Sequence, residues 1–369
     1  MSFGEVIISW YHQHKRDLPW RNIKDPYKIW LSEIILQQTR VEQGLAYYQR
    51  FVKKYPDVKK LAAAKEDEVL KLWQGLGYYS RARNLHHAAK EIVRHYNGKF
   101  PKRYEDIRSL RGVGDYTAAA IASFAYNQPY PVVDGNVYRL LSRYLGITTP
   151  INSGKAKKEF LEAATVLMEE AAVNISSKQD CRVPTATAYS DFNQAIMEFG
   201  ARQCRPANPL CGECPLSNSC FAFAKKQVKM LPVKIKKEKI RNRYFYYTVI
   251  SNGETILLKK RTANDIWKNL YDFPLIEKSK RISSEKLFIS EGWKEIFGNR
   301  SSSSVAIKES KTFTHLLSHQ RIFAKFFEVK INSGIKIKDA KMIKPKNIHD
   351  YAVPKLIENY LKLRENGDL

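Results

Sequence analysis

Four of the five cysteines lie within 17 residues of one another, so thiol groups are the first candidates for chemistry in this sequence. They are Cys204, Cys211, Cys214 and Cys220, in the pattern C-x6-C-x2-C-x5-C. The chain starts without a basic segment followed by an apolar one, so we expect no secretory signal and no disulfides. Clustered thiols in a reducing compartment usually bind metal, and by ligand type alone tetrahedral zinc and an iron–sulfur cluster are equally good candidates. Cys181 lies outside the spacing and is expected to be a bystander thiol.

Two carboxylates could supply acid–base chemistry. Glu33 lies off the apolar stripe of a predicted helix, one helical turn before Gln37, and such a polar pair usually marks a solvated helix face. Asp134 comes directly before Gly135-Asn136-Val137. A carboxylate or amide at Asp134 or Asn136 usually caps a helix, and the helix dipole would help to keep a carboxylate there ionised.

A glycine-rich turn, Gly112-Val113-Gly114, joins two predicted helical segments. Glycines allow a sharp turn and a close approach to a ligand, and the amides before a helix can bind a phosphate oxygen. Many turns between helices use glycine, so the turn alone is weak support for phosphate binding.

The net charge of +26 favours a polyanionic partner, with nucleic acid first, an anionic membrane surface second, and a merely lysine-rich surface as the alternative. The charge is uneven, since residues 225–369 carry 32 Lys and Arg against 15 Asp and Glu. The excess begins in residues 225–243, which we interpret as an exposed basic linker that contacts phosphate if the partner is DNA.

The secondary-structure elements expected from the sequence indicate two domains. Helical stripes with short loops indicate an all-α domain over residues 1–224. Residues 244–363 predict an α+β domain, with strands on both sides of Asn252-Gly253, a strand at 321–331 and a closing helix at 353–363. Ser301–Ser304 reads as a polar loop. No run of about 18 apolar residues occurs, so no transmembrane helix is expected.

The cysteine spacing, the Gly112–Gly114 turn and Asp134 about twenty residues later together resemble the helix-hairpin-helix DNA glycosylases of the endonuclease III and MutY type. The segments Trp30–Thr39 and Gln74–Arg83 are most similar to MutY. The resemblance implies a [4Fe–4S] cluster on the four cysteines, in the loop 204–220.

The resemblance also implies a reaction. Glu33 would protonate adenine at N7, and Asp134, with Asn136 beside it, would stabilise the cationic sugar left behind. Burial would keep Glu33 protonated. Endonuclease III has a lysine where this chain has Tyr116, and a phenol cannot form a Schiff base. A monofunctional glycosylase is therefore expected, with Tyr116 hydrogen-bonded to Asp134.

Contacts to the DNA follow from the same resemblance. Gln38 would wedge into the base stack, and Leu76 and Tyr78 would pack against it, although both could equally be core residues at a helix start. Arg81 would lie near phosphate. The complete implied DNA-binding set is Gln38, Thr39, Leu76, Tyr78, Arg81, Gly112 and Gly114.

The second domain resembles the Nudix-like C-terminal domain of MutY through Lys260–Pro274, but the metal-binding run G-x5-E-x7-R-E-x2-E-E-x-G is missing. We therefore expect this domain to recognise the DNA lesion and not to catalyse a reaction. Leu317-Ser318-His319 is similar to the family loop that senses 8-oxoguanine. The family has Phe where this chain has Leu317, which leaves Ser318 and His319 as the hydrogen-bonding groups.

We expect a multidomain protein, an all-α helix-hairpin-helix glycosylase with an iron–sulfur loop joined to an α+β Nudix-like domain. It would act in the cytoplasm, at the nucleoid in a bacterium, as a monomer without membrane contact. Its substrate would be double-stranded DNA with adenine opposite 8-oxoguanine or guanine. The alternatives are a glycosylase for thymine mismatches or oxidised pyrimidines, a nucleotide-pool Nudix hydrolase and a non-enzymatic DNA-binding protein. Residues 172–188 look longer than the family connection and have no assigned role.

Overall fold

The computed structural model describes residues 1–177, 187–235, 240–298, 306–331 and 337–367. Cys181 and the predicted loop Ser301–Ser304 lie outside these residues. The chain divides into two compact units, each described by itself below. The first comprises Met1–Ala62 and His87–Lys237, and the second comprises Ala63–His86 and Glu238–Leu369.

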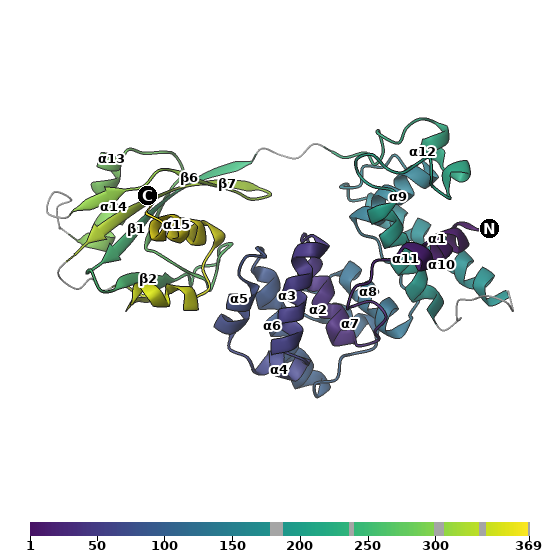
Figure 1. The fold of residues 1–369 in the computed structure, drawn as a ribbon, viewed down its shortest axis with the longest axis horizontal. Helices are drawn as coiled ribbons and strands as arrows, with labels where there is room; N and C mark the ends of the chain where they lie inside the picture. The colour runs from purple at the N-terminus through teal and green to yellow at the C-terminus, as the bar shows by residue number, and fades with distance from the viewer. Residues whose placement is uncertain (178–186, 236–239, 299–305, 332–336, 368–369) are drawn as a thin grey trace. The chain divides into compact units, whose positions relative to one another are not determined.

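The first unit is helical, which confirms the predicted all-α domain (Figure 1). Its helices are α1 (Phe3–His14), α2 (Pro26–Leu36), α3 (Val41–Lys54), α4 (Val58–Ala63), α6 (Ser80–Tyr96), α7 (Tyr104–Ser109), α8 (Asp115–Tyr126), α9 (Gly135–Leu145), α10 (Ala156–Ser177), α11 (Ala188–Arg202) and α12 (Phe221–Ala224), of which α4 and α6 run on into the second unit. No helix in the described part of the chain is long and apolar enough to cross a membrane.

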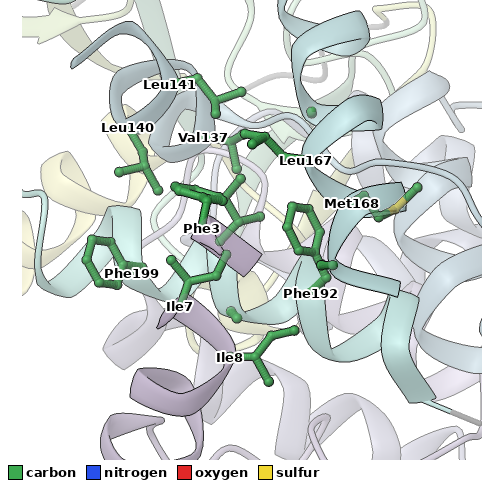
Figure 2. Close-up of a cluster of buried hydrophobic side chains, with 14 of the residues drawn as sticks. Phe3, Ile7, Ile8, Val137, Leu140, Leu141, Leu167, Met168, Phe192 and Phe199 are labelled. Atoms are coloured by element: carbon green, nitrogen blue, oxygen red, sulfur yellow. The ribbon is translucent and has the colours of Figure 1, made fainter. Parts of the chain in front are cut away.

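A core of aromatic and branched side chains forms where α1, α9, α10 and α11 meet (Figure 2). Phe3 and Ile7 of α1 pack against Val137 of α9 and Phe192 of α11, and all four side chains are at most 5% exposed. Each such burial stabilises the fold by about 1.5–3 kcal/mol. This core fixes α9 and α11, two of the helices that carry the site.

The second unit is built on a mixed sheet, and the predicted α+β class is confirmed. Its elements are α5 (Glu66–Trp73), β1 (Arg241–Ser251), β2 (Ile256–Lys260), β3 (Tyr271–Asp272), β4 (Leu275–Lys278), α13 (Ser284–Phe288), α14 (Glu291–Phe297), β5 (Ile307–Glu309), β6 (Phe313–Leu316), β7 (Gln320–Lys330), β8 (Ala340–Ile343) and α15 (Lys355–Glu365). The main path of the sheet is β3-β2-β1-β7-β5, and β1 runs parallel to β7 along its whole length.

The predicted hairpin between β1 and β2 is confirmed. Ser251 pairs with Ile256, Gly253 has a φ of 95°, and the Asn252 side chain accepts from the backbone of Thr255 at 2.7 Å. The positive φ explains why glycine stands in this turn. The predicted strand at 321–331 and helix at 353–363 correspond to β7 and α15, each shifted by one or two residues.

Both ends of the predicted linker, residues 225–243, belong to folded units. Arg143 of α9 donates to the carbonyls of Val228 and Leu231, and Ile151 donates to that of Val233. Strand β1 already begins at Arg241. The sequence missed the packed part because its partners, Arg143 and Ile151, lie about 80 residues earlier in the chain.

Gly4 provides a test of how closely α1 packs on α10. A Cβ at Gly4 would lie 2.2 Å from the Cβ of Ala171, so one helix would have to shift. We expect Gly4→Ala to lower the free energy of unfolding by about 1–3 kcal/mol, measured by chemical denaturation. Gly154→Ala is the matched control, because its added methyl meets no atom within 4 Å. Equal stability of the two variants would contradict this packing.

Candidate functional site

Helix α2 buries a carboxyl group. Asp25 caps the helix by accepting from the backbone of Tyr27 and Lys28, and Pro26 occupies the first turn, where a missing N–H is harmless. The predicted apolar stripe is buried, but so is Glu33, which is only 8% exposed. This agrees with the burial of Glu33 that the family resemblance implied, because α8 covers the face that such a polar pair would usually expose to solvent.

Tyr116, near the start of α8, donates its phenol hydrogen to Glu33 Oε2 at 2.9 Å. We had expected Tyr116 to bond Asp134, and the structure corrects this. A phenol has one hydrogen to donate, and Glu33 receives it. Burial raises the pKa of Tyr116 well above its ordinary value, so the side chain remains a donor.

Asp134 is the N-cap of α9. Its Oδ1 accepts from the backbone amides of Asn136 and Val137, both at 2.8 Å, and its Oδ2 accepts from the Asn136 side chain at 2.7 Å. Arg139 donates in turn to Asn136 Oδ1 at 2.9 Å and to the carbonyls of Gly200 and Cys204. The sequence predicted the cap, and the structure adds the network that holds the carboxylate in one orientation.

The two carboxyl groups differ in electrostatics. Burial raises the pKa of Glu33 to about 7, with a further rise from Asp134, against the opposing effects of Tyr116 and Arg21. A substantial part of the Glu33 population can then hold a proton at neutral pH, whereas an ordinary glutamate is almost fully ionised there. Burial also raises the pKa of Asp134, but its hydrogen bonds and the charge of Arg139 favour the ionised form.

Glu33, Tyr116, Asp134 and Asn136 line one cavity of about 210 Å³ within the first unit. A buried carboxyl and a buried capped carboxylate facing one space can protonate a leaving group and stabilise the cation that remains. The fold therefore brings together the four residues that were predicted from the sequence to be catalytic.

Sequence reasoning missed a second charged cluster in the same cavity. Glu198 of α11 has a fully buried side chain and binds Arg16 at 2.7 Å and Arg21 at 2.6 Å. Burial opposes ionisation of Glu198, but the bonds from the two arginines hold its pKa at about 2. The sequence feature that could have indicated this cluster is a glutamate between Met197 and Phe199, within an otherwise apolar run.

The predicted DNA-contacting turns of the first unit have the backbone that the sequence indicated. Gly112 has a φ of 80°, which favours glycine, and Gly114 caps α8 with open space around it. Gln38 is exposed with a φ of 57° just after α2, and Thr39 lines the cavity. The backbone amides of Gly112 and Gly114 and the side-chain amide of Gln38 therefore lie at the surface.

The turn after α5, in the second unit, contains Leu76 and Tyr78. Leu76 is 7% exposed and Tyr78 is 43% exposed, so Tyr78 is the one available for surface contact. Arg81, which we had expected near phosphate, lies over the Trp73 ring and donates to the carbonyls of Leu76 and Gly77. Its guanidinium therefore holds the turn together.

Leu317, Ser318 and His319 form the tip of the β6–β7 hairpin, also in the second unit. Leu316 pairs with Arg321, and the Leu317 amide donates to the Gln320 carbonyl at 2.8 Å. Ser318 and His319 are exposed and Leu317 is half-buried. The predicted loop is therefore a hairpin tip with its polar groups at the surface.

The four cysteines follow α11, carry free thiols and line one apolar cavity. Arg143 of α9 lies 3.4 Å from Cys204 Sγ and also donates to the backbone of Arg205. Among the described residues, no three His, Cys, Asp or Glu side chains converge closely enough to hold a metal ion. The donor set is nevertheless all thiol, which suits zinc or an iron–sulfur cluster.

Comparisons with known proteins match both units. Residues 31–165 match the family model of the HhH-GPD superfamily base excision DNA repair proteins, and residues 246–363 match the NUDIX domain. An adenine DNA glycosylase of Buchnera aphidicola subsp. Schizaphis graminum is 32% identical over 372 residues, which covers 98% of each chain.

Two further relatives match about 60% of this chain. The adenine DNA glycosylase of Homo sapiens is 40% identical over 230 residues, 60% of this chain and 39% of the human one. The solved structure of a thermostable thymine-DNA glycosylase is 30% identical, with a TM-score of 0.52 over 60% of this chain and 95% of that one.

Replacing Tyr116 tests the electrostatics of Glu33. The phenol hydrogen bond favours the carboxylate, so Tyr116→Phe should raise the pKa of Glu33 above its value of about 7. Carboxyl ¹³C shifts of glutamate-labelled protein, assigned with Glu33→Gln, would measure this. Tyr138→Phe is the control, because the Tyr138 ring packs against Phe160. Titration of Glu33 near 4.5 in the unaltered protein would contradict the buried site.

Proposed function

Since this chain belongs to the adenine DNA glycosylases, HhH-GPD proteins of base excision repair, we propose that it excises adenine paired with 8-oxoguanine or guanine. One observation carries the mechanism. A carboxyl with a pKa of about 7 and a capped carboxylate face the same cavity. This pair fits an N-glycosidic bond, whose cleavage needs an acid for the base and an anion for the sugar.

The reaction begins when the adenine nucleotide leaves the duplex and enters the cavity. Glu33 gives its proton to adenine N7, and the electron pair of the glycosidic bond goes to the departing base. The sugar becomes an oxocarbenium ion, which the negative charge of Asp134 stabilises while Asn136 holds the carboxylate in place. Water then adds to the sugar carbon and loses a proton, which leaves an abasic site.

We propose that the enzyme stops at base removal. A lyase needs an amine that attacks the sugar carbon, and Tyr116 supplies only a phenol that is committed to Glu33. No lysine is among the residues that line the described cavity. The DNA strand should therefore remain unbroken.

We propose that DNA contacts come from turns in both units. The amides of Gly112 and Gly114 suit a phosphate oxygen, and Gln38, which is exposed just after α2, would enter the space left by the flipped base. Thr39 lies beside Gln38. In the second unit, exposed Tyr78 would contact the stack, while Leu76 and Arg81 support the turn that presents it.

The Nudix-like domain, which we propose to span residues 244–363, would recognise the base opposite the adenine. Ser318 and His319 are exposed polar groups at a hairpin tip, and Leu317 beside them supplies apolar contact. The helical domain with its cysteine loop would occupy residues 1–224. We propose that the monomer is the active form.

We further propose that Cys204, Cys211, Cys214 and Cys220 hold a [4Fe–4S] cluster. The four thiols line one apolar cavity and supply only sulfur ligands, which supports an iron–sulfur cluster as the bound group. The bound group would hold the loop 204–220 in its folded form. Arg143 would place positive charge beside the thiolates.

A duplex panel tests the proposed activity. The protein should excise adenine from A·8-oxoG and A·G duplexes, leave the strand intact, and act poorly on T·G and oxidised pyrimidines. Glu33→Gln and Asp134→Asn should each slow single-turnover excision at least about a hundredfold with duplex binding retained. Far-UV spectra would exclude misfolding. Near-normal excision by either variant contradicts the mechanism, and preferred action on T·G makes the enzyme a thymine glycosylase.

Metal analysis tests the cluster. Purified protein should contain iron and absorb broadly near 400 nm, roughly where thiolate-to-iron charge transfer falls. Cys211→Ser should reduce both signals together. Colourless, active protein with stoichiometric zinc would overturn the assignment.

A further inference from the structure

A chain of hydrogen bonds in the second unit ends at the hairpin tip, and Arg243 of β1 is its fixed end. The Arg243 side chain is 11% exposed and forms ion pairs with Glu277 at 2.7 Å and Asp265 at 3.2 Å. It also lies 4.7 Å from the centroid of the Phe245 ring. A guanidinium held on three sides has little freedom to move.

Arg243 determines which way the amide of Gln320 points. Its Nη1 donates to Gln320 Oε1 at 3.0 Å. A guanidinium has donors only, so the oxygen and not the nitrogen of the amide must face it. The NH2 group of Gln320 therefore faces the opposite way, where its nitrogen lies 2.7 Å from Nε2 of His319. Gln320 is 6% exposed and is enclosed in this orientation.

This contact selects one tautomer of neutral His319. The Gln320 amide nitrogen donates, so the imidazole Nε2 must accept, and the ring hydrogen lies on Nδ1. Nδ1 lies 3.2 Å from Ser318 Oγ and donates to it. The Ser318 hydroxyl hydrogen then points away from His319, toward whatever contacts the tip.

We propose that Arg243 and Gln320 are positioning residues for lesion recognition, because they make Ser318 present an O–H donor and one free lone pair. This rests on the proposed preference for 8-oxoguanine. That base carries an N7–H donor beside a C8 carbonyl acceptor, whereas guanine has a bare N7 and a C8–H. A hydroxyl that both donates and accepts matches the oxidised edge at two atoms and the guanine edge at one.

Gln320→Met keeps the length of the side chain but removes the donor that faces His319. The ring can then adopt its other tautomer, in which Nδ1 accepts the Ser318 hydrogen. We expect the preference for A·8-oxoG over A·G to fall about three- to tenfold, the worth of one hydrogen bond, with A·G excision unchanged. Thr314→Ala, an exposed change in β6 of the same hairpin, is the control and should keep the preference.

Nitrogen NMR of the full chain with ¹⁵N-histidine reads the tautomer independently of activity. The His319 signals, identified by their loss in His319→Gln, should show Nδ1–H in the unaltered protein and Nε2–H in Gln320→Met. Nε2–H in the unaltered protein would overturn the inference. The inference would also be overturned if Gln320→Met kept the preference for A·8-oxoG over A·G while Ser318→Ala lost that preference. A protein with no preference for 8-oxoguanine fails the proposed function instead, while the tautomer still tests the bond chain.

Discussion

The proposed reaction depends on keeping one carboxyl group protonated beside another that is ionised. Water would ionise both, so the fold must remove water from Glu33 and supply donors to Asp134. Burial under α8 does the first, and the start of α9 does the second. Helix α9 is held in position by the surrounding helices, because it packs against the core that α1, α10 and α11 form.

The arginines of the cavity have to be balanced for the same reason. A positive charge near Glu33 favours its carboxylate and would release the proton too early. Glu198 accepts bonds from both Arg16 and Arg21, so its carboxylate balances one of their two positive charges. The cavity therefore contains several charged groups, while Glu33 retains its raised pKa.

Local patterns predicted much of this fold, and long-range packing accounts for what they missed. The apolar stripe of α2, the cap at Asp134 and the Asn252-Gly253 hairpin each depend on residues close together in sequence, and each was predicted. Burial of Glu33 depends on a helix more than eighty residues away, and the hydrogen bond from Tyr116 depends on the same packing. The orientation of the Gln320 amide could not be predicted from the sequence either, because it is set by Arg243 on a strand that runs parallel to its own.

Asp134 also limits how this protein can vary. The same carboxylate caps α9 and faces the cavity, so most substitutions would remove the proposed stabiliser of the sugar cation and loosen a helix that the core depends on. Serine, threonine and asparagine can cap a helix but carry no charge. Inherited changes at this position should therefore divide into two kinds, abundant but inactive proteins from the residues that cap, and scarce, unstable proteins from the rest.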